Sequence, residues 1–310
     1  MLDRINALIT SDVTDIYIGG AGIWVQRDGG ATRADIHLTE SQVRELAIKL
    51  VNLGGRHIDD ASPCVDVRLA EGVRVHAVLS PVSIGGTEIS IRVPRPDFQR
   101  LHDWVSAGDI SPAMAERLRD VVKQRQTVLV SGATGAGKTA LLASLMSEVE
   151  SHQRIITIED VAELKIQHPR CVGLEVRQPN TDGRGEISIA DLVRHSLRMR
   201  PERLIVGECR GAEVVDMLRA FTTGHSGGGT TLHANTLSEV AVRIDSLGAL
   251  AGMSSPAIAR LASSAIDVII HIQNDAGRRR MSLGRFVVEN GILCVVRDSE
   301  PALRDATHVA

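Results

Sequence analysis

The sequence predicts an α/β protein in which a smaller α+β domain precedes a larger domain with a doubly wound, mostly parallel sheet. Length is the first reason, because 310 residues suffice for roughly two domains of about 150 residues each. A change of pattern is the second, since hairpin signals come first and alternating strand and helix signals follow. We therefore expect domains at residues 1–97 and 113–310, joined by a linker at 98–112.

The first domain is expected to consist mainly of antiparallel hairpins and one helix. Its short apolar runs have the length and composition of strands, and Gly-Gly pairs separate several of them. These runs are DIYI, GIWVQ, VDVRL, GVRVHAVL and EISIRV. One segment, SQVRELAIKLVNLGG, instead repeats its apolar residues at helical spacing. Pro94 and Pro96 break the last strand and lead into the linker.

The second domain alternates strand-like and helix-like segments. The strand-like runs are TVLVSG, RIITI, RLIVG, TTLH and DVIIHI. The stretches between them, such as ALLASLMSEVE and AEVVDMLRAFTTG, repeat apolar residues near the helical period of about 3.6. Short, continuous apolar runs suit strands that helices bury on both faces of a parallel sheet.

Composition excludes several classes of protein. Apolar residues make up 43% of the chain and charged residues 24%, which is typical of a folded globular protein. No apolar run approaches the roughly 18 residues that span a bilayer. The formal net charge is −3, and the aromatic residues are two tryptophans, one tyrosine and three phenylalanines. The chain thus offers neither a global basic field nor stacking platforms for nucleic acid.

The cysteines and the N-terminus indicate a cytoplasmic protein. The four cysteines lie far apart, without the spacing of a zinc site. The first residues include acidic side chains where a signal peptide needs a basic region followed by an apolar one. The basic triplet Arg278–Arg280, beside Gly277, predicts a solvated turn rather than a nucleic-acid patch.

A phosphate-binding motif follows the first strand of the second domain. Residues 132–139 read GATGAGKT, which matches G-x-x-x-x-G-K-[ST] between a predicted strand and a predicted helix. Glycines let backbone N–H groups surround a phosphate, Lys138 neutralises the β- and γ-phosphates, and the Thr139 hydroxyl can bind Mg²⁺. ATP or GTP binding is therefore predicted. The predicted nucleotide-binding residues are Gly132, Ala133, Thr134, Gly135, Ala136, Gly137, Lys138, Thr139 and Ala140.

Polar side chains follow the ends of the next predicted strands. RIITI runs into Glu159 and Asp160, RLIVG into Glu208, and TTL into His233. Ligands of an open parallel sheet bind beyond the carboxyl ends of its strands, so we expect these side chains to meet beside the phosphate loop. Carboxylates and a histidine at that place are the groups that Mg²⁺ binding and water activation need.

These residues resemble a known family, the type II/IV secretion and type IV pilus ATPases. The family's motifs stand here in its order: the P-loop GATGAGKT, the Asp box ITIEDVAEL, the Walker B segment LIVGECRG and the His box TGHSGGGTTLHANT. The segment RVHAVLSPVSIGGTEISIRVP resembles the arginine-bearing end of the family's N-terminal domain. The segments IEDVAEL and LHANT are most similar to the corresponding segments of the Tad/Flp pilus ATPases, and the conjugation-type ring ATPases of type IV secretion are the next most similar.

The resemblance implies a RecA-like fold and a homo-hexamer that hydrolyses ATP, with Mg²⁺, to power Tad/Flp pilus assembly or protein secretion. It also implies a cytoplasmic protein, peripheral to the cytoplasmic face of the inner membrane and held there by partners such as an inner-membrane platform protein. No direct contact with nucleic acid is expected. The alternatives are a conjugation-type type IV secretion ring ATPase, a nucleic-acid motor and a nucleotide-binding regulator without turnover.

The family's motifs assign catalytic and metal-binding roles. Glu208 is the first choice for orienting the attacking water and Glu163 is the second, so the order of the two stays open. Lys138 is the catalytic cation of the P-loop. The implied metal shell consists of Thr139, Glu159, Asp160 and Glu208.

Histidines and arginines complete the implied site. His225 and His233 match the His box, in which the family uses histidine to sense the γ-phosphate or to relay its loss. Arg74 and Arg92 match the arginine-bearing segment of the first domain. An arginine that reaches the γ-phosphate would stabilise the charge that develops during phosphoryl transfer, and the first domain would close on ATP.

Overall fold

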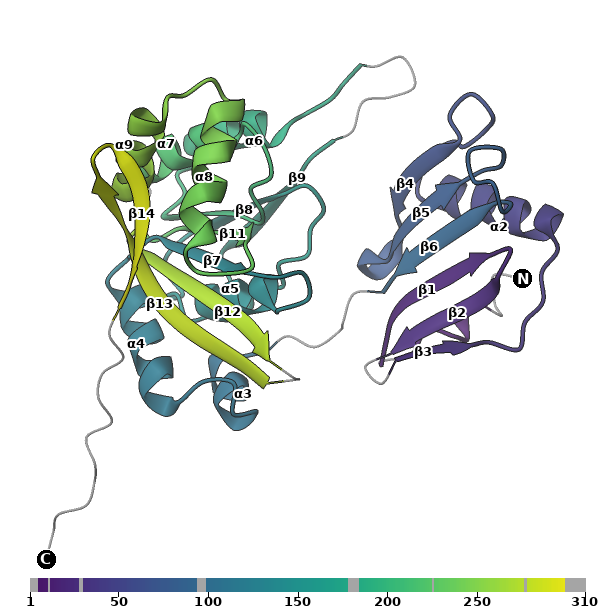
Figure 1. Cartoon of the computed structure of the whole chain (residues 1–310), viewed down its shortest axis with the longest axis horizontal. Helices are drawn as coiled ribbons and strands as arrows, with labels where there is room; N and C mark the ends of the chain where they lie inside the picture. The colour runs from purple at the N-terminus through teal and green to yellow at the C-terminus, as the bar shows by residue number, and fades with distance from the viewer. Residues whose placement is uncertain are drawn as a thin grey trace, which may run out of the picture. The chain divides into compact units, whose positions relative to one another are not determined.

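The structure, a computed structural model, describes residues 5–10, 12–27, 30–93, 99–177, 184–224, 226–275 and 278–298. Contacts divide the chain into two compact units, Met1–Asp97 and Phe98–Ala310 (Figure 1). Each unit has a hydrophobic core of its own. Among the residues so described, no helix combines the length and the apolar character needed to cross a membrane.

The first unit is an antiparallel sheet with one long helix packed against it. The strand order across the sheet is β3-β2-β1-β6-β5-β4. The strands are β1 (Val13–Gly19), β2 (Gly22–Arg27), β3 (Gly30–Arg33), β4 (Cys64–Arg68), β5 (Arg74–Val78) and β6 (Glu88–Arg92), with the 3-10 turn η1 (Ala70–Gly72) between β4 and β5. The helix, α2 (Glu40–Leu53), begins at a capping box formed by Thr39 and Gln42.

Burial alternates along the strands of the first unit, so only one face of the sheet lies in the core. In β5 and β6 the inward residues are Val75, Ala77, Ile89 and Ile91, which pack with the apolar side of α2. Successive side chains of a strand point to opposite faces. The other face of the sheet therefore carries the remaining side chains of these strands.

The second unit is doubly wound, with helices on both faces of a mostly parallel sheet (Figure 1). The strand order is β14-β13-β12-β7-β11-β10-β8-β9; the strands from β12 to β9 run parallel, and β13 and β14 are antiparallel additions at one side. The strands are β7 (Val128–Gly132), β8 (Ile155–Glu159), β9 (Cys171–Glu175), β10 (Arg203–Val206), β11 (Gly229–His233), β12 (Val268–Asp275), β13 (Arg278–Glu289) and β14 (Ile292–Arg297).

Two groups of helices enclose this sheet. The helices are α3 (Leu101–Ser106), α4 (Pro112–Lys123), α5 (Lys138–Ser147), α6 (Ile189–Ser196), α7 (Val214–Thr222), α8 (Glu239–Leu250) and α9 (Ser255–Ala265), with the 3-10 turn η2 (Leu197–Met199) after α6. Val128 and Val130 of β7 share a core with α3, α4 and α5, whereas Leu129 packs in a second core with α6 to α9. The central strand β7 is thus buried on both faces, and it leads straight into the phosphate loop.

The doubly wound sheet and the smaller α+β unit before it confirm the predicted fold class, and two local expectations differ from the structure. The segment 98–112, expected to be a linker, contains α3 and places Leu101, Trp104 and Ile110 in the core of the second unit. The triplet Arg278–Arg280, expected to be a turn, starts β13, because Arg278 to Arg280 pair in register with β12.

Candidate active site

The phosphate loop joins the carboxyl end of β7 to the first turn of α5. Gly132 has φ +155°, and a Cβ there would lie 2.5 Å from the carbonyl oxygen of Ile272. Gly137, at the N-cap of α5, has φ +97° in the left-handed region and no side chain that caps the helix. Only glycine fits both positions, and the N–H groups of the first turn of α5 are left to bind an anion.

Lys138 is the buried cation of this loop. Its side chain turns back over the loop, where Nζ donates a hydrogen bond of 2.9 Å to the carbonyl oxygen of Ala133. The residue is 7% exposed. Burial lowers the pKa of Lys138, and the charge of Glu208 opposes this shift. The negative charge of a phosphate at the loop would stabilise the ammonium as the charge of Glu208 does.

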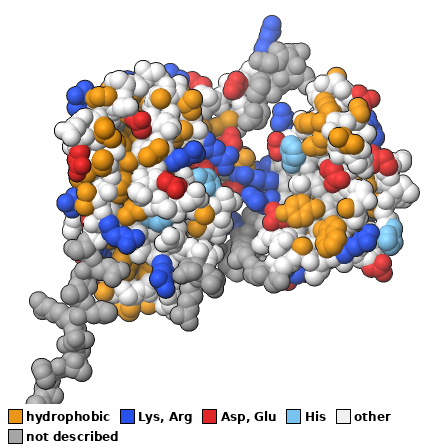
Figure 2. Space-filling model, viewed as in Figure 1, with side chains coloured by type: hydrophobic (Ala, Val, Ile, Leu, Met, Phe, Trp, Pro, Cys, Tyr) orange, Lys and Arg blue, Asp and Glu red, His pale blue; other side chains and the backbone are white. Residues whose placement is uncertain are grey.

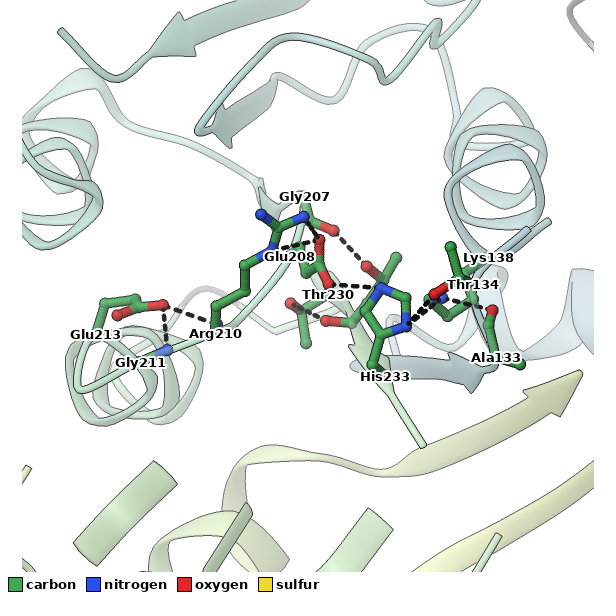
Figure 3. A network of polar contacts seen from close by, with 11 residues as sticks. Ala133, Thr134, Lys138, Gly207, Glu208, Arg210, Gly211, Glu213, Thr230 and His233 are labelled. Atoms are coloured by element: carbon green, nitrogen blue, oxygen red, sulfur yellow. Dashed lines mark hydrogen bonds and ion pairs between the residues drawn. The ribbon is translucent and has the colours of Figure 1, made fainter. Parts of the chain in front are cut away.

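His233, at the end of β11, links the P-loop lysine to the Walker B glutamate (Figure 3). Its Nδ1 lies 3.3 Å from Lys138 Nζ and 3.5 Å from Thr134 Oγ1, and its Nε2 lies 3.0 Å from Glu208 Oε1. Burial and the charge of Lys138 lower the pKa of His233. The neutral ring therefore accepts from Lys138 at Nδ1. Its Nε2 lies within ion-pair distance of Glu208 Oε1 but makes no hydrogen bond with it.

Arg210 holds the other oxygen of Glu208. Its Nε and Nη2 donate to Glu208 Oε2 at 2.8 and 2.5 Å, and these contacts raise the pKa of Arg210. Glu213 fixes the backbone around it by accepting the N–H groups of Arg210 and Gly211 at 2.9 and 2.8 Å. Glu208, 22% exposed in its side chain, is thus oriented through Oε2 by Arg210, while its Oε1 faces His233 at the edge of the phosphate loop.

The three acids of the Asp box occupy different environments. Glu159 is 5% exposed, and its Oε1 accepts the backbone N–H groups of Glu163 and Leu164 at 2.8 and 2.9 Å. Burial raises the pKa of Glu159. Asp160 and Glu163 are exposed, and both contribute to the electrostatic environment of Arg210. Glu159 therefore shapes the loop, while the other two carboxylates face outward.

The residues near the loop suit Mg²⁺ that arrives with a nucleotide. Within the described ranges, no three His, Cys, Asp or Glu side chains converge on a point where they could hold a metal ion. Mg²⁺ usually keeps several waters and binds one or two carboxylates together with substrate phosphates, so it needs no such cage. Thr139 stands in the first turn of α5, and Glu208 follows β10, as that arrangement requires.

The two candidate arginines of the first unit lie next to each other on its sheet. Arg92 of β6 pairs directly with Arg74 of β5 and, on its other side, with Asp15 of β1, and Arg74 pairs with Arg68 of β4. Arg92 Nε donates to Asp15 at 3.2 Å. The structure describes each unit by itself, so the approach of these arginines to a nucleotide stays a prediction. His225 lies outside the described residues.

A family model described as type II/IV secretion system protein matches residues 2–279. The chain belongs to this family. Among its relatives, the "Putative conjugal transfer protein Rv3659c" of Mycobacterium tuberculosis is 45% identical over 285 residues, which cover 89% of this chain and 81% of that protein. The type IV secretion system protein PtlH of Bordetella pertussis is 30% identical over 309 residues, covering 88% of this chain and 90% of PtlH.

A crystal structure of the pilus retraction motor PilT with bound ADP is similar to this type II/IV secretion family member, with a TM-score of 0.66 at 24% identity. The match covers 91% of this chain and 81% of that one. At this level of identity the likeness concerns the fold, which is RecA-like in the second unit. The resemblance read from the four motifs is confirmed at the level of the family, and the Tad/Flp branch stays a prediction.

Two features of the site were not foreseen from the sequence. Arg210 was not singled out, although its place two residues after Glu208 is a signal that could have found it. The second feature is a buried pair beneath the loop: Ser131 Oγ of β7 lies 2.9 Å from Nδ1 of His271, its direct neighbour on β12. The register between β7 and β12 brings these two residues together, and no sequence motif predicts the contact.

Proposed function

We propose that this chain binds ATP together with Mg²⁺, hydrolyses it, and works as a homo-hexamer that powers a conjugation or type IV secretion machine. The observation that carries the proposal is the contact series from Lys138 through His233 to Glu208 at the phosphate loop. It joins the cation that would hold the γ-phosphate to the carboxylate that would orient the attacking water. A binding protein without turnover has no need of the second group.

The residues of the chain divide the work as follows. The N–H groups of the loop and Lys138 bind the β- and γ-phosphates, and Glu208 holds the attacking water in line. Mg²⁺, when bound, supplies the charge that neutralises the phosphate oxygens in the transition state. His233 contacts both Lys138 and Glu208. A γ-phosphate that binds Lys138 would replace the contact between Lys138 and His233. The His233 ring could then move, which would change the surroundings of Glu208.

Arg74 and Arg92 complete the proposed mechanism. They share one face of the first unit's sheet as direct cross-strand neighbours, and Arg92 pairs with Asp15 there. Two neighbouring guanidinium groups can also bind one further anion together. In the proposal that anion is the γ-phosphate held by Lys138 of the same chain. Closure of the first unit on ATP and its release after hydrolysis would then turn chemistry into rotation of one unit against the other.

The names of the relatives favour a conjugation or type IV secretion machine. The names of the two relatives above refer to conjugal transfer and to type IV secretion. The proposed place of the hexamer is the cytoplasmic face of the inner membrane, against an inner-membrane partner protein. Figure 2 shows hydrophobic side chains on the face that carries α8 and β14, where Val242, Leu250, Ile292 and Val296 are exposed. Such surfaces suit protein partners better than nucleic acid.

Assembly of a Tad/Flp pilus is the second candidate function, because the sequences of the Asp box and the His box are most similar to that branch. The two candidates can be separated in the organism that carries the chain. Deletion of the gene should abolish either conjugative transfer and type IV secretion or surface pili. Complementation by the wild type should restore the lost function, and complementation by Lys138→Ala should not. Loss of pili alone would favour the second candidate.

Purified protein tests the enzymatic part of the proposal. Wild-type chain should release phosphate from ATP only with Mg²⁺, and Lys138→Ala should not, because the loop loses the charge that engages the β- and γ-phosphates. Circular dichroism should show that the variant is folded. The rate should not depend on added single- or double-stranded DNA. Turnover that appears only with DNA would indicate a nucleic-acid motor, and nucleotide binding without turnover would indicate a regulator.

A further inference from the structure

Buried Trp104 and half-buried Arg279 form a pair against the outer side of the phosphate loop. The guanidinium carbon of Arg279 lies 4.9 Å from the centre of the Trp104 ring, and Arg279 Nη1 donates to Asp109 Oδ2 at 3.1 Å. A Cβ placed on Gly137 would be 3.1 Å from Trp104 Cη2 and 3.6 Å from Arg279 Cζ and Nε. The pair thus touches the residue that caps α5.

This pair is held rigidly by its surroundings. Trp104 is 1% exposed, and its Nε1 donates to Ser144 Oγ of α5 at 3.0 Å. The side chains of Arg279 and Asp109 are 24% and 14% exposed. The Ser144 hydroxyl in turn has two acceptors within reach, the carbonyl oxygens of Gln99 at 2.5 Å and of Ala140 at 2.8 Å. The indole therefore locks α3 to the helix of the phosphate loop, and the guanidinium lies on that fixed surface.

A second cation at this place calls for an explanation. Arg279 stands beside Gly137, at the N-terminus of α5, which is the positive end of the helix. Asp109 balances one of these charges. The positive end of the helix remains, and an anion in the loop would be attracted both to it and to Arg279.

The strand order shows which part of a nucleotide this would be. Glu208 and His233 follow β10 and β11, on one side of β7, whereas Arg279 belongs to β13, beyond β12 on the other side. A nucleotide whose γ-phosphate faces Glu208 and His233 has its α-phosphate and nucleoside on the opposite side of the loop. That side is where Arg279 lies.

We infer that Arg279, aligned by Trp104 and Asp109, is a further nucleotide-binding residue, which contacts the α-phosphate end of a bound nucleoside di- or triphosphate. The inference rests on the proposed function, because it needs a nucleotide in the loop. It adds a binding group that is separate from the hydrolytic groups. Arg279 is expected to stabilise the substrate and the transition state equally, and so to act on KM rather than on kcat.

Arg279→Met tests the inference, with Arg280→Met as the matched control. Arg280 is the next residue of the same strand, exposed and on the opposite face. Arg279→Met should weaken ATP, ADP and GDP binding by a similar factor of at least about tenfold, as expected for the loss of one charge-assisted hydrogen bond. It should raise KM with kcat within about threefold. Arg280→Met should bind as the wild type does, and Arg279→Lys should recover part of the affinity.

Fluorescence gives a readout that does not depend on turnover. Trp24 and Trp104 are the two tryptophans of the chain, so Trp24→Phe leaves Trp104 as the sole reporter. Saturating Mg²⁺-ADP should change the Trp104 emission in this background, and added Arg279→Met should reduce the change. The titration is repeated with Lys138→Ala. The Trp104 emission of this variant should not change, because the variant should not bind the nucleotide.

The possible failures are distinguishable. If the wild type binds no nucleotide, the proposed function fails. If the wild type binds and Lys138→Ala does not, but Arg279→Met binds ADP as tightly as the wild type, the inference about Arg279 is wrong and the proposed function stands. A loss confined to ATP, with ADP unaffected, would place Arg279 at the γ-phosphate and also overturn the inference. If Arg280→Met weakens nucleotide binding as much as Arg279→Met does, the effect comes from the net charge of the protein, and the inference is wrong.

Discussion

At the scale of single residues, Glu159 is the carboxylate whose environment departs most from the metal-binding role that the sequence suggests. Its Oε1 is occupied by two backbone N–H groups of the Asp box loop. Its Cγ lies so close to β10 that a Cβ on Gly207 would be 2.7 Å away. The side chain therefore acts as an internal anchor for the loop that carries Asp160 and Glu163.

Two substitutions of Glu159 separate anchoring from metal binding. Burial raises the pKa of Glu159 above its ordinary 4.5, so the ionised form costs stability at pH values above the folded-state pKa. Glu159→Gln keeps an oxygen acceptor and removes that cost, so it should be at least as stable as the wild type. Glu159→Ala leaves two N–H groups without a partner and should lose about 1–3 kcal/mol in urea denaturation.

Exposed Glu163 supplies the control, since Glu163→Gln should change stability little. The Mg²⁺ concentration that half-saturates hydrolysis is measured on the same proteins. A several-fold increase in Glu159→Gln, with unchanged stability, would restore the metal-binding role and contradict the anchoring role.

At the scale of elements, the pairing of β7 with β12 places a titratable group beneath the phosphate loop. His271 is 2% exposed and lies against Ser131. Burial lowers the pKa of His271 below its ordinary 6.5; a hydrogen bond with the backbone of Asn235 opposes this effect, and the charge of Arg297 reinforces it. The unfolded chain consequently takes up a proton near pH 6.5 that the folded chain takes up only at lower pH.

The free energy of unfolding should therefore fall as the pH drops below about 6.5, by up to about 1.4 kcal/mol per pH unit for this group. His271→Asn keeps a hydrogen-bonding side chain without the titration, so its stability should depend less on pH between 7 and 5. Exposed His152, replaced in the same way, serves as the control. Urea titrations at several pH values measure the slopes, and equal slopes for wild type and His271→Asn would contradict the assignment.

The elements that the sequence predicted are those with a strong local signal. The buried parallel strands β7, β8, β10, β11 and β12 are continuous apolar runs bounded by turn residues, and the P-loop motif fixes the turn after β7. Strands β3, β9, β13 and β14 were missed. Of these, β9 and β13 carry mixed side chains, such as the basic start of β13, and depend on pairing with a neighbour. Local pattern cannot report such pairing.

The candidate site follows the same division. Lys138, Glu208 and His233 each stand at a strand end or in a motif, and the structure brings them together. The contact of Arg279 with Asp109 and the His271–Ser131 pair each join residues from different parts of the chain. Such contacts depend on the three-dimensional arrangement and leave no spacing signal in the sequence.

At the scale of the whole molecule, the proposed mechanism needs the two units of one chain to share a nucleotide. Arg92→Ala and Lys138→Ala chains should each be nearly inactive. If Arg92 serves the nucleotide of its own chain, rings that mix the two variants should also stay inactive, because every site lacks either its arginine or its lysine. Phosphate release from mixtures, with mixed rings verified by differential tagging, measures this.

Recovery of substantial activity on mixing would show that Arg92 serves a neighbouring chain, and it would contradict closure of the two units on one ATP. Light scattering with Mg²⁺ and a non-hydrolysable ATP analogue tests the ring itself. A head-to-tail contact that closes makes a ring, so a hexamer is expected, and a chain that stays monomeric would contradict the assembly.

Glu208→Gln tests the central claim, that the Lys138–His233–Glu208 series is a site of ATP hydrolysis, most directly. The variant keeps the size of the side chain and removes the charge that orients water, so it should bind ATP as tightly as the wild type. Single-turnover hydrolysis of bound ATP should be at least about 10²-fold slower, as expected for a group that acts in the transition state. Hydrolysis at the wild-type rate would contradict the claim, and a larger loss in Glu163→Gln would transfer the role to Glu163.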